Sequence, residues 1–213
     1  MSDDADRPLV AVLDYGIGNL RSAEKALQRA GADARLTDDR RLIDDADAVV
    51  LPGVGAFGRC VAALDRSGLA EVAVGAAGSG RPFLGICIGM QLLYEASEEA
   101  PGVAGLGVLA GGVARLPDGV KHPQMQWNVL ERTDRPSGLL DGVPDPAWVY
   151  FVHSFAAEDA TIAVATCDYG GPVVAAVEQG QVWATQFHPE KSGATGLAIL
   201  ERFVARAASP AGV

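Results

Sequence analysis

The sequence predicts an α/β protein with an open, mixed but mostly parallel sheet flanked by helices, and with antiparallel strands in its C-terminal half. Up to residue 100, short apolar runs alternate with segments of helical periodicity, which is typical of β-α repeats around a parallel sheet. After residue 100, strand-like segments follow one another closely, which favours antiparallel pairing. The 213 residues suit a single domain over 1–213, since no linker or repeat divides the chain.

The composition limits the partners and the compartment that we expect. The formal net charge is −10 without any cluster of Lys and Arg, which argues against nucleic acid or an anionic membrane as the main partner. No apolar run approaches the ~18 residues of a membrane span. The acidic start, MSDDADRPLV, is not a signal or transit peptide, so we expect a cytoplasmic protein whose residues 1–8 form a flexible tail.

The cysteines favour a reducing compartment and argue against a metal site. The chain has three of them, Cys60, Cys87 and Cys167, and no C-x-x-C pair. Such an odd, sparse set argues against a disulfide framework and against zinc. We therefore expect neither a metal nor a cofactor, and a free thiol suits this setting.

The N-terminal half is predicted as alternating strands and helices. A strand over residues 9–13 leads into Gly16-Ile17-Gly18, and a helix follows with Gly31 as its stop. The G-x-G could belong to a dinucleotide site, but Arg21 stands where the Rossmann pattern has its third glycine, so a tight turn is the better interpretation. Further strands are expected over residues 34–37 and 46–51, and helices over 58–67 and 68–77.

The most informative stretch is Arg81–Ser97, RPFLGICIGMQLLYEAS. Residues 82–86 predict a short buried strand, and Gly85, Cys87 and Gly89 have the spacing G-x-C-x-G. The apolar residues that follow are near helical spacing, so a helix is expected next; they are Met90, Leu92, Leu93 and Tyr94. A strand, a sharp turn and a helix with a thiol at the corner form the nucleophile-elbow pattern, with Cys in place of Ser.

Cys87 at this corner has the surroundings that a nucleophile needs. Glycines on both sides leave room for a strained backbone, and the N-terminus of a helix favours the reactive thiolate. The backbone N–H of Ile88, the next residue, is free to donate to an oxyanion. The alternative is a buried structural cysteine beside packing glycines, and this stretch alone leaves both open.

A second glycine-rich segment, PGVGAFG over residues 52–58, follows the strand expected over 46–51. It lacks the Lys-Ser/Thr of a phosphate-binding loop. Its N–H groups could instead supply an oxyanion hole, because the carboxyl ends of neighbouring parallel strands meet at one sheet edge, where Cys87 is also expected. An ordinary Gly/Pro turn is the alternative.

The C-terminal half is predicted as an antiparallel extension of the sheet, closed by a helix. Strand-like segments occur within residues 102–116, 121–132, 147–155 and 162–171. Residues 173–190 resemble a hairpin that turns at Gln179-Gly180. A helix is expected over residues 192–208, with an apolar face of Leu197, Leu200, Phe203 and Val204.

A cysteine nucleophile needs a base, and the chain has three histidines. His122 lies in an expected loop, and the acid nearest to His153 in sequence is Glu158. His188 follows an apolar strand, where an extended backbone would bring Glu190 to the same side to orient the imidazole. A base with an orienting carboxylate is the triad arrangement, although His-Pro-Glu alone could also be a surface turn.

Taken together, these residues resemble the class I, triad-type glutamine amidotransferases, whose fold is flavodoxin-like. The matching pieces are PGVGAFG, FLGICIGMQLLYEASEE and ATQFHPEKSG. Four features are most similar to the glutaminase subunits of imidazole glycerol phosphate synthase, namely DYGIGNLRS, PGVGAF, YFVHSF and PQMQWN. The resemblance covers residues 9–205.

The resemblance implies a glutaminase whose triad is Cys87, His188 and Glu190. Cys87 would attack the side-chain amide of glutamine, His188 would transfer the proton, and Glu190 would orient His188. The resemblance also implies three further groups of residues: Val54, Gly55 and Ile88 at an oxyanion hole, Gln91, Glu99 and the backbone at Ser154 and Phe155 around the glutamine, and Met125, Trp127, Asn128 and Lys191 at a partner interface.

The same resemblance implies a heterodimer. Ammonia would pass to a separate cyclase subunit, a (β/α)8 barrel, which makes imidazole glycerol phosphate and aminoimidazole carboxamide ribotide in histidine biosynthesis. The family usually has Gly before the Trp-Asn of the interface, where this chain has Gln126. Glu95 or Glu98 could take the place of Glu99.

Three other hypotheses remain. A glutaminase subunit of another class I enzyme, such as pyridoxal phosphate synthase, would bind a different barrel protein. A free-standing cysteine hydrolase of the same fold would be strongly active alone. A binding protein without chemistry is disfavoured by the intact set of Cys87, His188 and Glu190.

Overall fold

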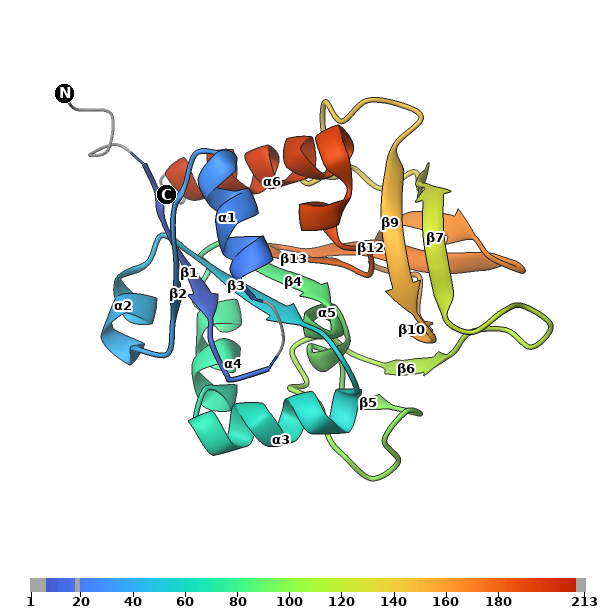
Figure 1. The fold of residues 1–213 in the computed structure, drawn as a ribbon, viewed down its shortest axis with the longest axis horizontal. Helices are drawn as coiled ribbons and strands as arrows, with labels where there is room; N and C mark the ends of the chain where they lie inside the picture. Colours follow the sequence, from blue (N-terminus) through green and yellow to red (C-terminus); the bar gives the residue numbers. More distant parts are fainter. Residues whose placement is uncertain (1–6, 18–19, 210–213) are drawn as a thin grey trace.

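An open mixed sheet runs through the middle of the molecule (Figure 1). The computed structural model describes residues 7–17 and 20–209, so most of the tail expected over residues 1–8 and the turn residues Gly18 and Asn19 lie outside the description. The strands of the main sheet follow in the order β2 (Asp33–Thr37), β1 (Leu9–Leu13), β3 (Ala48–Gly53), β4 (Phe83–Cys87), β13 (Val182–Thr185), β12 (Pro172–Gln179), β11 (Ala163–Asp168) and β8 (Glu131–Arg132).

The pairing confirms the predicted mixed sheet. Strands β2, β1, β3, β4 and β13 are parallel, whereas β13, β12, β11 and β8 pair antiparallel. The expected hairpin joins β12 to β13. In the central register Gly53 lies opposite Cys87, and Thr185 lies opposite Ile86. The carboxyl ends of β3, β4 and β13 therefore meet at one edge, which is where open α/β sheets bind ligands.

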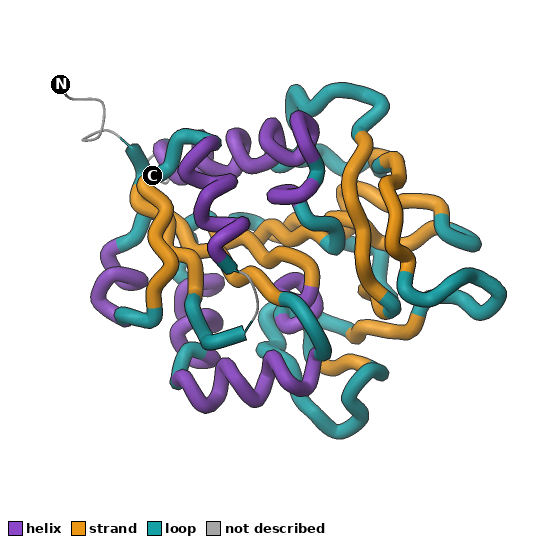
Figure 2. Tube along the Cα trace, viewed as in Figure 1, coloured by secondary structure: helices purple, strands orange, loops and turns teal. Residues whose placement is uncertain are grey.

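Helices cover both faces of the parallel part of the sheet (Figures 1 and 2). Helices α1 (Arg21–Arg29) and α6 (Gly193–Ala208) lie on one face, and α3 (Phe57–Ser67), α4 (Ala70–Gly78) and α5 (Ile88–Leu92) lie on the other. Every residue of β3 and β4 is buried between these layers, which explains why both strands are continuous apolar runs. Within the described ranges, no helix is both long and apolar enough to cross a membrane.

The short helix α2 (Arg40–Asp45) was not predicted from the sequence. Its N-cap Asp39 accepts a hydrogen bond from the backbone N–H of Arg41. Only Ile43 of this helix is buried. Six residues with a single buried position show no helical periodicity of apolar residues in the sequence.

The prediction that all C-terminal strands extend the main sheet is wrong, because some of them form two further sheets. One contains β10 (Phe155–Ala157), β6 (Gly112–Arg115) and β5 (Ala96–Ser97), and the other pairs β7 (Gln124–Val129) with β9 (Trp148–His153). Strand β9 alternates between buried and more exposed residues, so it needs cover on one face only. It packs that face near the start of α6 instead of joining the main sheet.

The helix after Cys87 and the strands expected over residues 102–116 are both shorter than predicted. Helix α5 ends at Leu92, and β6 is the strand found within residues 102–116. The carbonyl oxygens of Leu92 and Leu93 accept the backbone N–H groups of Leu106 and Leu109. The loop before β6 thus supplies hydrogen-bond donors to the last carbonyl groups of α5. These bonds occupy groups that a longer helix or a longer strand would need.

Candidate active site

Cys87 ends β4 and adopts a strained backbone conformation. Its φ and ψ are 55° and −112°, and it is the non-glycine residue with a positive φ in the described part of the chain. Holding a side chain in such a region costs about 1–3 kcal/mol, so the surrounding structure must impose it. Ile88 begins α5 directly afterwards. The strand, sharp turn and helix expected at this cysteine elbow (residues 85–89) are confirmed.

Glycines around the elbow are required by close packing of backbone on backbone. A Cβ atom added to Gly89 would overlap the carbonyl oxygen of Leu51 in β3. A Cβ at Gly53 would lie 2.6 Å from the nitrogen of Gly89, and one at Gly85 would lie 3.0 Å from Leu93 Cδ1. The elbow and the end of β3 are therefore in direct backbone contact, which fixes the position of Cys87.

His188 and Glu190 form a buried pair beyond the end of β13. The Nδ1 atom of His188 lies 2.7 Å from Glu190 Oε1, and their side chains are 2% and 7% exposed. The expected extended backbone was wrong in detail, because residues Pro189–Lys191 form the 3-10 helix η1. Ser192 stabilises this turn by donating from its hydroxyl to the carbonyl oxygen of His188 at 2.6 Å. The carboxylate thus reaches the imidazole through a tight turn.

The two buried histidines have opposite pKa shifts. Burial lowers the pKa of His188, but hydrogen bonds and charge interactions with Cys87 and Glu190 outweigh it and raise the value to about 9. Burial lowers the pKa of His153 to about 4, although its Nδ1 lies 2.8 Å from the carbonyl oxygen of Phe155. At neutral pH His188 is therefore cationic and can give up a proton, whereas His153 is neutral.

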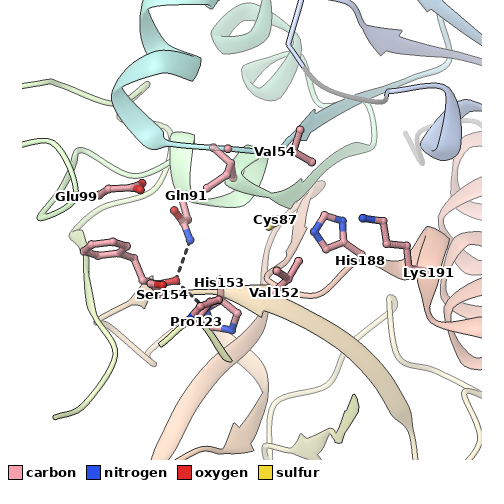
Figure 3. A pocket seen from close by; sticks show the side chains of 13 residues that line it. Val54, Cys87, Gln91, Glu99, Pro123, Val152, His153, Ser154, His188 and Lys191 are labelled. Carbon is pink, nitrogen blue, oxygen red and sulfur yellow. Dashed lines mark hydrogen bonds between the residues drawn. The ribbon is translucent and has the colours of Figure 1, made fainter. Parts of the chain in front are cut away.

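A cavity of about 380 Å³ lies at the shared strand edge (Figure 3). This volume falls within the range of small-molecule sites. Figure 3 shows Cys87 between Gln91 and His188. Glu190 lies outside the lining, bonded to His188. The residues predicted for the site that do line the cavity are Val54, Gly55, Cys87, Ile88, Gln91, Glu99, Ser154, Phe155, His188 and Lys191.

Gln91 and Gln186 link the elbow to the strand beyond the cavity. The Nε2 atom of Gln91 donates to the carbonyl oxygen of Phe155 at 2.9 Å and to Gln186 Oε1 at 3.0 Å. Gln186 Nε2 in turn lies 3.8 Å from Cys87 Sγ. The buried Oε1 of Gln91 has no hydrogen-bond partner among the described residues, which leaves an acceptor for a ligand. Sequence reasoning missed Gln186, whose signal is a polar residue inside an apolar run.

Glu99 is the acid that lines the cavity among the three candidates. Its Oε2 atom accepts the backbone N–H of Phe57 at 2.8 Å, at the start of α3. Glu95 and Glu98 instead accept the backbone N–H groups of Gly111, just before β6, and of Arg115, its last residue. A carboxylate at the start of α3 also argues against a phosphate there, so the phosphate-loop interpretation of residues 52–58 loses support.

The outward face of β7 and β9 is apolar and begins at the cavity. Met125 and Trp127 are 61% and 48% exposed, and Val152, opposite Met125 in the register, lines the cavity. The 49% exposed Trp148 extends this face, and sequence reasoning missed it although it alternates with buried Val149. We call this surface, formed by Met125, Trp127, Trp148, Tyr150 and Val152, the β7–β9 face.

The other residues expected at the interface differ in exposure and in hydrogen bonding. Lys191 is exposed and lines the cavity. Gln126 is exposed. Asn128 is half-buried, and its Nδ2 atom donates to the carbonyl oxygen of Asp168 at 2.9 Å, which ties β7 to the end of β11.

Comparison with known proteins gives one consistent family. The model of the class-I glutamine amidotransferases matches residues 11–207. The imidazole glycerol phosphate synthase subunit HisH of Methanothermobacter thermautotrophicus is 49% identical over 197 residues, which cover 92% of this chain and 98% of that protein. The subunit of the same name from Deinococcus radiodurans is 48% identical over 201 residues, covering 92% and 93%.

Solved structures share the fold at lower identity. A crystal structure of a glutamine amidotransferase superposes with a TM-score of 0.74 at 22% identity, covering 94% of this chain and 99% of the other. The structure of PurLQS from Thermotoga maritima gives a TM-score of 0.72 at 20% identity, covering 93% and 98%. At these identities the similarity supports the sheet and helix arrangement alone.

Proposed function

The chain belongs to the class I glutamine amidotransferases, in their HisH branch of imidazole glycerol phosphate synthase subunits, and we propose that it hydrolyses glutamine at Cys87 and supplies the ammonia to a synthase partner. One observation carries this proposal. A thiol at a strained elbow and an imidazole hydrogen-bonded to a carboxylate line a single cavity, although residues 87 and 188 are far apart in the sequence.

The triad accounts for amide hydrolysis in two steps. Cys87 Sγ forms a bond to the side-chain carbonyl carbon of glutamine, and the C–N bond breaks as His188 gives its proton to the leaving nitrogen. Ammonia and a thioester result. His188, now neutral, takes a proton from water as the water attacks the thioester, which releases glutamate and restores Cys87 and His188 for the next cycle. Glu190 holds the imidazole in position and stabilises its positive charge.

The oxyanion of each tetrahedral intermediate would be stabilised by backbone N–H groups of Val54, Gly55 and Ile88. Ile88 is the first residue of α5, where backbone N–H groups have no partner within the helix. Val54 and Gly55 follow β3 and line the same cavity. Donors of this kind act where charge develops, so they accelerate the chemical step.

The substrate would be held at the end of the cavity away from His188. Glu99 offers its remaining carboxylate oxygen to the α-ammonium group, and Gln91 offers its unpartnered Oε1. The backbone at Ser154 and Phe155 would complete the site. These roles are our proposal for a zwitterionic amino acid, whose charges require an acidic group on one side and N–H donors on the other.

We infer that the β7–β9 face binds the partner, a (β/α)8-barrel cyclase, in a heterodimer. An apolar face with two half-exposed tryptophans is unusual for a surface that only meets water, and aromatic residues are typical of interface centres. Met125, Trp127, Asn128 and Lys191 would then surround the exit of the cavity. Ammonia released there could reach the barrel, which forms imidazole glycerol phosphate and aminoimidazole carboxamide ribotide in histidine biosynthesis. We place this assembly in the cytoplasm and treat residues 1–213 as one domain.

The test is a Cys87→Ala variant assayed with the barrel partner and its nucleotide ligand. We expect glutamine-dependent synthesis to be abolished, while synthesis from added ammonium salt continues at the wild-type rate. This result separates the loss of ammonia production from a failure to assemble. Glutaminase activity that survives in the Cys87→Ala variant would refute the proposal.

A further inference from the structure

Two buried side chains that the mechanism does not use form hydrogen bonds to carbonyl oxygens of the segment Pro52–Gly55. Tyr15 follows β1 and is 4% exposed, and its hydroxyl donates to the carbonyl oxygen of Pro52 at 2.7 Å. Cys60 lies in α3 with no exposed surface, and its Sγ lies 3.4 Å from the carbonyl oxygen of Val54, to which the thiol donates. Tyr15 and Cys60 also interact with each other, so the two anchors form one buried cluster.

The strand order explains why this cluster lies beside the active site. Strands β1, β3, β4 and β13 are neighbours in that order and run parallel. Tyr15 therefore follows one strand, the segment Pro52–Gly55 spans the end of the next, Cys87 ends the third, and His188 follows the fourth. The anchors, the proposed oxyanion donors and the triad form one row along the carboxyl edge of the sheet.

Anchoring a carbonyl group also sets the direction of an N–H group. In a trans peptide unit, the C=O bond and the N–H bond of the next residue point in opposite directions. When Val54 C=O faces Cys60, the N–H of Gly55 must point away from Cys60 and from the core beneath α3. When Pro52 C=O faces Tyr15, the N–H of Gly53 points away from Tyr15. The two bonds thus fix the peptide units on both sides of the Gly53–Val54 peptide.

Both anchors keep their protons at neutral pH, as hydrogen-bond donors must. Burial raises the pKa of Cys60 to about 11 and raises the pKa of Tyr15 far above its ordinary value. Neither residue lines the cavity, so neither can contact the substrate.

We propose that Tyr15 and Cys60 are positioning residues for glutamine hydrolysis, which orient the Pro52–Gly55 segment so that its N–H groups meet the oxyanion. This inference rests on the proposed function of the site. Because the oxyanion exists only during the chemical step, loss of an anchor should lower kcat much more than it changes KM. Loss of a residue needed only for stability would not lower kcat selectively relative to KM.

Tyr15→Phe tests the first anchor, with Tyr94→Phe as the matched control. Tyr94 is fully buried, and its hydroxyl has no hydrogen-bond partner among the described residues. In the complex with the barrel, we expect Tyr15→Phe to lower kcat on the order of tenfold with KM changed less than about twofold. Tyr94→Phe should leave kcat as in the wild type. Thermal unfolding of both variants reports on the fold.

A second reaction at the same thiol separates the anchors from the nucleophile. Alkylation of Cys87 by iodoacetamide forms no oxyanion, so its rate should be equal in the wild type and in Tyr15→Phe. The rate can be followed by mass spectrometry of the peptide that contains Cys87. If glutamine hydrolysis and alkylation fell together, the change would have disturbed Cys87 itself, and the proposal would be overturned.

The second anchor is tested by Cys60→Ala and Cys60→Ser, which decide the question if Tyr15→Phe does not fold. Serine keeps a donor towards Val54, so kcat should recover in Cys60→Ser relative to Cys60→Ala. Cys167→Ala removes an equally buried thiol and should leave kcat unchanged. Equal kcat in Cys60→Ala and Cys167→Ala would overturn the proposal. A wild-type complex without glutaminase activity would instead refute the proposed function itself.

Discussion

The cysteine elbow and the β7–β9 face lie on different sides of one cavity, and they are built in different ways. Around Cys87, backbone packs on backbone, and Gly53 and Gly89 leave no room for a Cβ atom. Across the cavity, β9 alternates buried residues such as His153 with exposed ones such as Trp148. The proposed chemistry is thus placed on a region that leaves no room for an added atom, whereas we expect the face proposed for the partner to vary without loss of the fold.

The largest effect is expected from Glu190→Gln, which changes the triad without changing the packing of the elbow. By comparison with a carboxylate-to-amide change in another triad, kcat should fall by roughly 10⁴-fold. The pKa of His188 should also fall from about 9, because the variant loses the carboxylate charge. A pH profile of kcat/KM in the complex measures both effects.

Glu178→Gln is the matched control for this change. Glu178 lies in β12 and accepts a hydrogen bond from the hydroxyl of Ser137 at 2.8 Å, and neither residue lines the cavity. This variant should keep the wild-type kcat. An equal loss of activity in both variants would mean that Glu190 has no special role.

Gly89→Ala tests the claim that the elbow tolerates no added atom. The new Cβ would overlap the carbonyl oxygen of Leu51, so we expect the free energy of unfolding to fall by about 3 kcal/mol or more. Gly75→Ala in α4 is the control, since its Cβ would meet nothing within 4 Å. That change should raise stability by about 0.5–1 kcal/mol. Denaturant unfolding gives both values, and similar stability of the two variants would contradict the packing account.

The histidines on the two sides of the cavity should give stability opposite dependences on pH. Because the pKa of His153 falls from 6.5 to about 4 on folding, stability should decrease as pH falls from 6.5 to 4, by on the order of 3 kcal/mol. In His153→Gln, the free energy of unfolding should change less between pH 6.5 and pH 4 than in the wild type. Because the pKa of His188 rises to about 9, its contribution is complete below pH 6.5 and is lost as pH rises through 9. Unfolding free energies measured over this range would contradict the account if His153→Gln kept the wild-type acid slope.

The smallest effect is expected at the β7–β9 face. Trp148→Ala should weaken binding of the barrel partner by about 2 kcal/mol, the loss typical of an aromatic residue at an interface centre. Because Trp148 is 49% exposed, the stability of the chain alone should change little. Val74→Ala in α4, a residue that is 41% exposed on another surface, should not alter the affinity. Calorimetric titration compares them, and equal affinities would exclude Trp148 from the interface.

The comparison also explains which parts of the molecule could be predicted from the sequence. At the elbow, short-range signals coincide: a buried strand, the G-x-C-x-G spacing and the start of a helix all lie within residues 82–90. The base could be chosen because Glu190 stands two residues from His188. That choice assumed an extended backbone between them, which is wrong because the segment is η1; the tight turn nevertheless brings Glu190 to His188.

Other features depend on contacts between distant segments and left no local signal. The end of α5 is set by the loop before β6, and the β7–β9 pair leaves the main sheet because of packing near the start of α6. The side chains of Gln186 and Tyr15 form hydrogen bonds with residues far away in the sequence. Such bonds are decided by the fold and have no sequence spacing of their own.

The most direct test of the account is to find which cysteine carries the glutamyl group during turnover. The complex would be quenched with acid while it hydrolyses isotopically labelled glutamine, and its peptides would be analysed by mass spectrometry. All three thiols are buried, so burial alone does not select one of them. The account predicts a labelled glutamyl thioester on Cys87 and none on Cys60 or Cys167. A label on either of those two cysteines, or steady glutamate production without a label on Cys87, would contradict it.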